Sequence, residues 1–194
     1  MSKPTAVILL CEDNLTSIFM RSYLKRRGIY HGLRVNVSPK GRGAAENWVI
    51  QHYPEQVNAY IKQRARTVTW LIVSIDADTG TVAGHIEQLN ASLRQSGSQR
   101  LRDINLDNEA IARLVPRRNI ETWILVLTGA TVNEIDDYSR SKDKDAWHEL
   151  VHPASHELHG WTRPNAQIPD RCTESLHHAI HELSHLELGR RVTR

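Results

Sequence analysis

A strand that ends in two aspartates is the most constraining feature of this chain. Residues 70–79 read WLIVSIDADT, so apolar side chains run almost unbroken into Asp76 and Asp78. Such a run is typical of a strand that is covered on both faces, as in a parallel sheet between layers of helices. Ligands of these sheets bind beyond the carboxyl ends of the strands, which is where the two aspartates lie.

The aspartate pair favours a metal site. Side chains alternate along an extended backbone, so Asp76 and Asp78 are expected to point to the same side. Two carboxylates with no basic residue between them repel each other. A divalent cation that prefers oxygen ligands, Mg²⁺ or Mn²⁺, would relieve that repulsion. The alternative is that both are turn or cap residues, because aspartate favours both positions.

Predicted strands and helices alternate through residues 1–130. The strand segments are 6–11, 33–37, 70–75 and 110–115. The helical patterns are 15–27, 44–66 with a break or kink at Pro54, 82–95 and 120–128, with a polar loop at 96–108. Asn14 and Asn119 are the expected N-caps of the first and last helix. This order predicts an α/β fold with a four-stranded parallel sheet flanked by helices. Residues 131–194 are expected to be a helical, His-rich extension packed on the same domain.

Acidic residues follow three of the predicted strands. Glu12 follows the first, Asp76 and Asp78 follow the third, and Glu121 begins the helix after the fourth. Because parallel strands end at the same edge of a sheet, these four acids are expected to lie together. Buried carboxylates without a partner are costly, so a shared metal ion is the preferred interpretation.

Basic residues favour a polyanionic partner. The net charge is +3, with the positive excess in residues 1–130 and a negative balance in residues 131–194. The basic clusters lie at 25–27, 40–42, 64–66 and 117–118. Nucleic acid is therefore an expected partner. An ordinary solvated surface is the alternative, since a charge of this size excludes little.

Membrane insertion and disulfide bonding are not expected. The chain has no run of 18 apolar residues, and its first apolar segment is too short for a secretory signal. Cys11 and Cys172 are isolated thiols without metal-ligand spacing. A reduced, cytoplasmic protein is the simplest interpretation.

The acid pattern resembles the TOPRIM domain, which topoisomerases, primases and overcoming-lysogenization-defect (OLD) family nucleases share. The similar features are a strand ending in Glu12, a helix, and a later strand ending in Asp76-x-Asp78. Residues 38–49 (SPKGRGAAENWV) and 115–125 (VPRRNIETWIL) also resemble small bacterial TOPRIM-like proteins. In those proteins an acid at the start of a helix, here Glu121, joins the site. The resemblance covers about residues 5–130.

This resemblance implies a TOPRIM-like nuclease that hydrolyses phosphodiesters with Mg²⁺ or Mn²⁺. Glu12, Asp76, Asp78 and Glu121 would hold the metal, and Glu12 could also act as general base. Phosphates of DNA or RNA would be contacted by Lys40, Arg42, Arg117 and Arg118. Such proteins often act in antiviral (phage) defence beside an ABC-type ATPase, which would be a separate partner because this chain has no ATPase motif. The sequence leaves a homo-oligomer open.

Two other functions remain open. VILLCEDN, residues 7–14, resembles a response-regulator receiver, in which Glu12 and Asp13 would hold Mg²⁺ and Asp76 would accept the phosphoryl group. The long separation of Glu12 from Asp76 and the extra Asp78 count against it. The tail also carries two HExxH strings, at 148–152 and 181–185, which could bind Zn²⁺ in a hydrolase. Helical spacing places their histidines opposite the apolar stripe, which favours a solvated face. Pro153 is expected to interrupt the first of these two helices.

Overall fold

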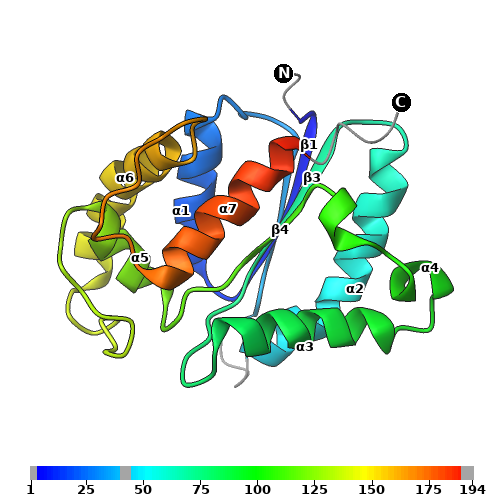
Figure 1. Cartoon of the computed structure of the whole chain (residues 1–194), viewed down its shortest axis with the longest axis horizontal. Helices are drawn as coiled ribbons and strands as arrows, with labels where there is room; N and C mark the ends of the chain where they lie inside the picture. Colours follow the sequence, from blue (N-terminus) through cyan, green and yellow to red (C-terminus); the bar gives the residue numbers. More distant parts are fainter. Residues whose placement is uncertain (1–3, 40–44, 189–194) are drawn as a thin grey trace.

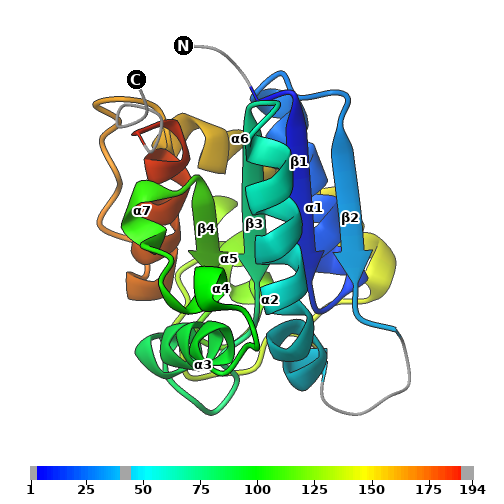
Figure 2. The same ribbon diagram turned by 90° about the vertical axis from the view of Figure 1, so that its right-hand side faces the viewer.

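Four parallel strands form the centre of the computed structural model, which describes residues 4–39 and 45–188. The strands are β1 (Ala6–Cys11), β2 (Leu33–Val37), β3 (Thr69–Ser74) and β4 (Ile111–Leu114). Their order in the sheet is β2-β1-β3-β4, and each neighbouring pair is parallel (Figures 1 and 2). The predicted α/β fold with a parallel sheet flanked by helices is therefore confirmed.

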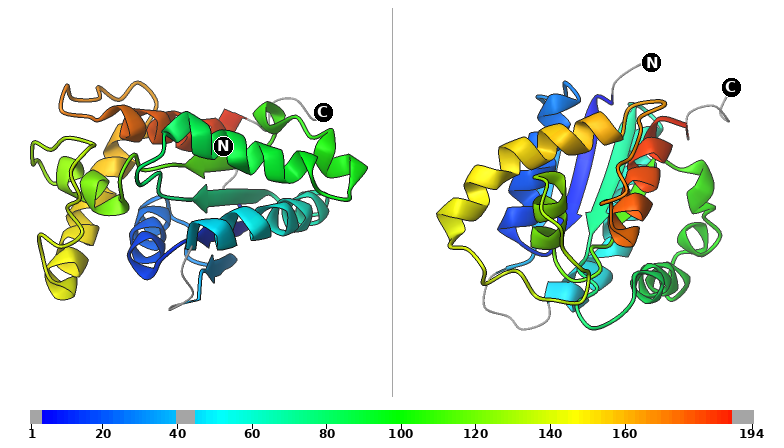
Figure 3. Two further views of the ribbon diagram at one scale, coloured as in Figure 1. Left: turned by 90° about the horizontal axis from the view of Figure 1, so that it is seen from below. Right: turned by 60° about the vertical axis from the view of Figure 1, so that its left-hand side comes forward.

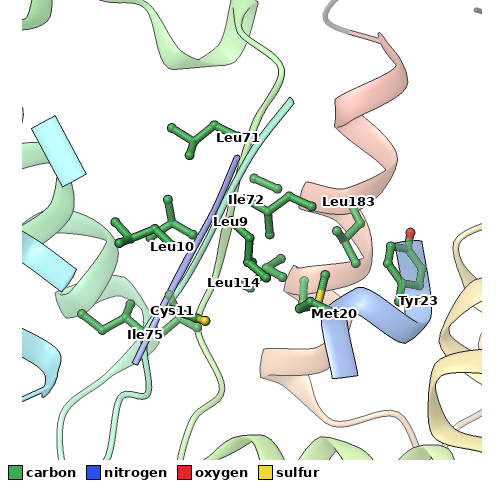
Figure 4. Packing of buried hydrophobic residues seen from close by; sticks show 14 of the residues in the cluster. Leu9, Leu10, Cys11, Met20, Tyr23, Leu71, Ile72, Ile75, Leu114 and Leu183 are labelled. Atoms are coloured by element: carbon green, nitrogen blue, oxygen red, sulfur yellow. The ribbon is translucent and has the colours of Figure 1, made fainter. Parts of the chain in front are cut away.

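The two central strands are buried on both faces. Every residue of β1 and β3 is buried, and Leu9 pairs with Ile72 in the parallel register. Figure 4 shows Leu9 and Ile72 on the side of Met20 and Leu183, while Leu10 lies on the opposite side of the sheet. Each large apolar side chain buried in this way contributes about 1.5–3 kcal/mol to folding. The continuous apolar runs of the sequence are thus explained by burial between two helical layers.

The helices that connect the strands follow the predicted order. They are α1 (Asn14–Arg26), α2 (Ala45–Arg64), α3 (Val82–Arg94), the short α4 (Gln99–Arg102), a 3-10 turn η1 (Leu106–Asn108) and α5 (Ile120–Leu127). The prediction of a polar loop at 96–108 was wrong, because α4 and η1 lie in it. Leu101 of α4 is buried, and this contact fixes the segment against the core.

The predicted N-cap of the first helix was also wrong. Asp13, not Asn14, is the N-cap of α1: its backbone is extended, and its carboxylate accepts a hydrogen bond from the Thr16 N–H at 2.7 Å. Helix α2 continues through Pro54, so the predicted break does not occur, while the alternative of a kink stays a prediction. The fully buried Tyr53 and Val57 anchor it to the sheet on both sides of the proline, so packing outweighs the lost hydrogen bond. Asn119 does cap α5, as predicted, and accepts from the Thr122 N–H.

Residues 131–188 return to the sheet through α6 (Lys144–Trp161) and α7 (Glu174–Leu188). Helix α6 lies beside α1, and the Ser22 and Ser155 hydroxyls are 2.7 Å apart (Figure 1). Helix α6 runs through Pro153 without interruption, which corrects the prediction; Val151 and Ala154 are buried on either side. No helix in the described part of the chain is both long and apolar enough to cross a bilayer.

Helix α7 covers the open edge of β4. The Glu182 carboxylate accepts a hydrogen bond from the Arg113 backbone N–H at 2.7 Å and also contacts the Arg113 guanidinium. At the start of α7, Ser175 accepts a hydrogen bond from Trp123 Nε1 at 2.7 Å. The contact with Arg113 ties the tail to β4 and covers an N–H of the edge strand that could otherwise pair with another chain. The contact with Trp123 ties the tail to α5.

Candidate acidic site at the carboxyl edge of the sheet

Three strand ends bring acidic residues to one edge of the sheet. Glu12 follows β1, Asp76 lies two residues after β3, and Glu121 is in the first turn of α5, after β4. The arrowheads of the strands in Figure 2 point toward this edge. Glu12 Oε1 accepts a hydrogen bond from the Asp76 backbone N–H at 3.0 Å, which joins the ends of β1 and β3 directly.

The carboxyl groups at this edge raise one another's proton affinity. Burial raises the pKa of Glu12 to about 7, and the charges of Asp13 and Asp78 add to the shift. Burial also raises the pKa of Glu121 to about 7, with a contribution from Asp13. The pKa of Asp76 is well above its usual range because of burial and, next, the charge of Glu12. The site is therefore an electrostatically unfavourable cluster of carboxylates when all are ionised.

The predicted convergence of four carboxylates within metal-bridging distance was not met. In residues 4–39 and 45–188, no group of three or more Asp, Glu, His or Cys side chains is arranged to hold an ion. Strand β3 ends at Ser74, and Asp78 has a left-handed φ of 46°, so the extended backbone assumed for the aspartate pair does not continue. Asp78 is exposed at the rim, whereas Asp76 is half-buried.

The donor chemistry at this edge nevertheless fits Mg²⁺ or Mn²⁺. All the candidate ligands are carboxylates, the class of ligand that these cations prefer. Glu12 Oε1 accepts the Asp76 N–H, which leaves its second carboxylate oxygen as the candidate ligand. A divalent charge would lower the raised pKa values of Glu12, Asp76 and Glu121 by favouring their ionised forms.

A pocket of about 490 Å³ opens beside Glu12 and Glu121, whereas Asp76 and Asp78 are not among its lining residues. Glu12, Asp13 and Glu121 contribute its acidic lining, and Lys142, Lys144 and His148 contribute cationic or titratable groups from the tail. The other lining residues are Asn14, Leu15, Val37, Ser38, Pro39, Ala45, Ser139 and Trp147. The pocket therefore combines acids that suit a cation with lysines that suit an anion.

The pocket corrects the prediction for His148. The sequence indicated that His148 faces away from any cleft, but it is half-buried and lines the pocket. Its neighbour Trp147 is buried, so the two lie at the border of the apolar stripe of α6. Lys142 and Lys144 were not singled out, because nothing in the local sequence shows that the tail folds back to the sheet edge.

The turn that carries Asp76 and Asp78 is held by residues that the sequence did not reveal. The Gly80 N–H donates to the Ala77 carbonyl at 2.6 Å, and Arg117 donates to the Gly80 carbonyl. The buried His85 ring lies against Gly80, with Nδ1 3.1 Å from the Thr81 carbonyl oxygen. This packing fixes the turn in one conformation.

The same histidine links the turn to α2. His85 Nε2 is 3.1 Å from Glu46 Oε1, and Glu46 is close enough to Glu12 to add to its raised pKa. His85 and Glu46 therefore form a support beneath the acidic edge. No sequence pattern signalled this role, since the contact joins two helices that are far apart in the chain.

The predicted phosphate-binding residues have mixed placements. Lys40 and Arg42 lie outside the described residues. Arg117 is half-buried and already donates to the Gly80 carbonyl, so it supports the aspartate turn. Arg118 is half-buried near Asp137, and its charge helps to lower the Asp137 pKa after the larger effect of hydrogen bonds from Ser139.

The HExxH histidines do not gather around a metal-binding glutamate. Glu182 is buried and paired with Arg113, while its neighbour His181 is exposed. His185 instead contacts the Asp107 carbonyl oxygen at 2.7 Å. In the first string, His152 is exposed and contacts Arg26. The described geometry gives no support to a zinc hydrolase.

No protein-family model, curated protein or solved structure matches this chain. The resemblance to TOPRIM proteins therefore stays a prediction from short motifs. A functional assignment has to rest on the geometry and charge of the acidic edge.

Glu12→Gln is expected to stabilise the metal-free protein at pH 8 and to change little at pH 5. An acid with a raised pKa binds its proton more tightly in the folded state, so its contribution to stability is lost as pH rises from about 4.5 through about 7. After solvent screening we expect about 1–2 kcal/mol at pH 8, which is about 2–8 °C in Tm.

Thermal melts in EDTA at both pH values measure this effect. Glu55→Gln, which neutralises an exposed carboxylate in the middle of α2, is the matched control and should not change the pH dependence. Burial lowers the pKa values of His159 and His178, so their contribution to stability changes with pH in the opposite direction to that of Glu12. The difference between variant and wild type cancels this contribution, because both proteins contain the two histidines. Equal Tm changes at both pH values would contradict the raised pKa of Glu12.

Proposed function

We propose that this protein is a Mg²⁺- or Mn²⁺-dependent phosphodiesterase that cleaves nucleic acid. The observation that carries the proposal is that Glu12, Asp76 and Glu121 follow three strand ends at one edge of the sheet and that each has a raised pKa. Stable structural carboxylates are normally paired or solvated, whereas perturbed ones cluster at functional sites. The adjacent pocket has room for a nucleotide-sized group.

Each acid has a proposed role in this reaction. Asp76 and Glu121 would be metal ligands, with Asp78 joining them from the rim. Glu12 would be a ligand or would accept a proton from the attacking water, because its pKa of about 7 suits a general base near neutral pH. A bound divalent ion would polarise the phosphoryl oxygen and orient the water.

The biological setting belongs to the same proposal. The sequence resemblance implies a role in antiviral defence beside an ABC-type ATPase. We propose that such a partner, if it is encoded next to this chain, activates the nuclease. This would explain how a cell tolerates a nuclease whose acidic edge is open to solvent at Asp78.

Cleavage assays with labelled single- and double-stranded DNA and RNA test the proposal. Cleavage is expected with Mn²⁺ or Mg²⁺ and not with EDTA, in the purified chain or after addition of the neighbouring ATPase. Glu121→Gln should lower the rate by about 10²-fold or more, the scale seen when a group that stabilises transition-state charge is removed. Glu55→Gln should cleave like wild type. Absence of metal-dependent cleavage in all combinations would refute the proposal.

A phosphoacceptor function is the second candidate, because one observation favours it. The sheet order β2-β1-β3-β4 equals the first four positions of the flavodoxin-like order, and Glu12 and Asp13 follow β1 opposite Asp76. Incubation with acetyl phosphate and Mg²⁺ separates the two functions. Labelling that Asp76→Asn abolishes and Asp78→Ala leaves intact would favour the phosphoacceptor over the nuclease.

A further inference from the structure

Helix α6 carries a row of basic and histidine side chains that begins at the acidic pocket. Lys144, His148, His152 and His156 recur every four residues, so they lie about one turn apart along one side of the helix. Lys144 and His148 line the pocket, whereas His152 and His156 are exposed farther along the helix. At about 100° per residue, these four and His159 fall within a sector of about 120°.

The far end of this row meets the basic end of α1. Arg26 of α1 contacts His152 of α6. His159 has a lowered pKa because of burial first and then the charges of Arg163, Arg27, His156 and Arg26. Helix α1 and the end of α6 therefore bring Arg26 and Arg163 near the same histidine, whose lowered pKa favours its neutral form. Figure 1 shows α1 and α6 side by side, and in the right-hand view of Figure 3 α6 crosses over α1.

We call Arg26, His152, His156, His159 and Arg163 the α1–α6 basic surface. Arg27 is left out because it already stacks on Tyr23 and Trp70.

The two arginines of the α1–α6 basic surface form no ion pair with a carboxylate in the described part of the chain. Of the acids of α6, Glu157 pairs with Arg171 at 3.2 Å. Asp145 and Glu149 are exposed and lie at about 100° and about 140° from Lys144, so they share the side of the row, but neither forms an ion pair in the described part of the chain. Arg26 and Arg163, which have no carboxylate partner and lie near the same His159 ring, form a site for a polyanion.

We propose that a nucleic-acid strand lies along the border between α1 and α6, with its phosphates contacted by Lys144, Arg26 and Arg163. The inference rests on the proposed nuclease function, because it places the reacting phosphodiester in the acidic pocket at the start of α6. From Lys144 to His159 the helix rises about 22 Å. At about 3.4 Å per nucleotide this spans on the order of six nucleotides. The histidine-rich tail is thereby assigned to substrate binding and not to zinc.

The proposed path of the nucleic acid along α6 differs from the one that the basic clusters of the sequence suggested. Arg117 supports the aspartate turn, whereas Lys144 lines the pocket and Arg26 and Arg163 lie near His159 at the far end of α6. Phosphate contacts set the register of the substrate, so this surface would determine which phosphodiester reaches Glu12 and Asp76.

Binding of a fluorescent oligonucleotide by Arg26→Glu/Arg163→Glu tests the inference. The measurement uses the Asp76→Asn background in EDTA, so cleavage does not interfere. The matched control is Arg100→Glu/Arg102→Glu, which makes the same change in net charge at exposed positions in α4. Circular dichroism and Tm confirm that both variants fold.

We expect Kd to rise at least tenfold in Arg26→Glu/Arg163→Glu and less than twofold in the control. The slope of log Kd against log salt should fall by about 1.4–1.8, since each lost phosphate contact removes about 0.7–0.9. An equal rise in Kd in both variants would overturn the inference, as would absence of oligonucleotide binding by the protein that keeps Arg26 and Arg163. Binding that depends on Arg26 and Arg163 without any cleavage by wild type would uphold the surface and refute the nuclease. Cleavage by wild type, together with unchanged binding in Arg26→Glu/Arg163→Glu, would uphold the nuclease and refute the surface.

Discussion

Asp76→Asn is expected to lower metal-dependent cleavage strongly while raising the Tm of the metal-free protein at pH 8. Asp76 is half-buried beside Glu12, and burial and this neighbouring charge raise its pKa well above the usual range. Asparagine keeps the shape of the side chain but removes the charge, so the repulsion disappears together with a proposed metal ligand. We expect a loss of about 10²–10³-fold in rate.

The opposite directions of the two effects make the experiment decisive. A residue that serves only the fold would lower Tm when it is replaced, and its loss of activity would follow from unfolding. Asp170→Asn, at an exposed loop position, is the matched control and should change neither quantity. Addition of Mn²⁺ should raise the Tm of wild type at pH 8 and leave that of Asp76→Asn unchanged. Full activity of Asp76→Asn would rule out the proposed metal site.

The sheet could be predicted from sequence because its signals are local. The apolar runs of β1 and β3 are continuous, and the cap at Asn119 is a single-residue feature. That Glu12, Asp76 and Glu121 lie at the same edge could then be predicted from the parallel topology alone. These conclusions need only periodicity and the rule that parallel strands end on the same side.

The site could be predicted only in part, because its details depend on turns and on long-range packing. Alternation in an extended strand suggested that Asp78 points with Asp76, but the strand ends at Ser74 and the chain turns at Asp78. The apolar stripe of α6 correctly placed Trp147 in the core. It could not show that His148, at the border of that stripe, meets the end of β1.

The support under the aspartate turn was invisible for a similar reason. His85 is an unremarkable residue of α3 until α2 packs against that helix and brings Glu46 within 3.1 Å. Side chains that position a turn leave no periodic signal, since each is chosen by one contact in space. The contacts of Gly80 offer a direct way to measure how much this support matters.

Gly80→Ala is expected to destabilise the protein and to weaken cleavage together. A Cβ at Gly80 would lie 2.5 Å from His85 Cε1 and 3.0 Å from the Ala77 carbonyl oxygen, so the turn or the ring must move. Overpacking of this kind costs about 1–3 kcal/mol, which is a fall in Tm of about 2–12 °C at this chain length. Because Asp76 and Asp78 lie on the same turn, a shift of about 1 Å can lower the rate by about 10²-fold.

Gly97→Ala is the matched control, since a Cβ there has no neighbour within 4 Å in the described structure. It should keep wild-type activity and stability within about 1 kcal/mol. His85→Ala in the Gly80→Ala background then identifies the clash. If the ring is the obstacle, the double variant should be less destabilised than the sum of the two single changes, with a coupling of about 0.5–3 kcal/mol. Additive losses would mean that the Ala77 carbonyl oxygen, and not the His85 ring, is the obstacle to a Cβ at Gly80.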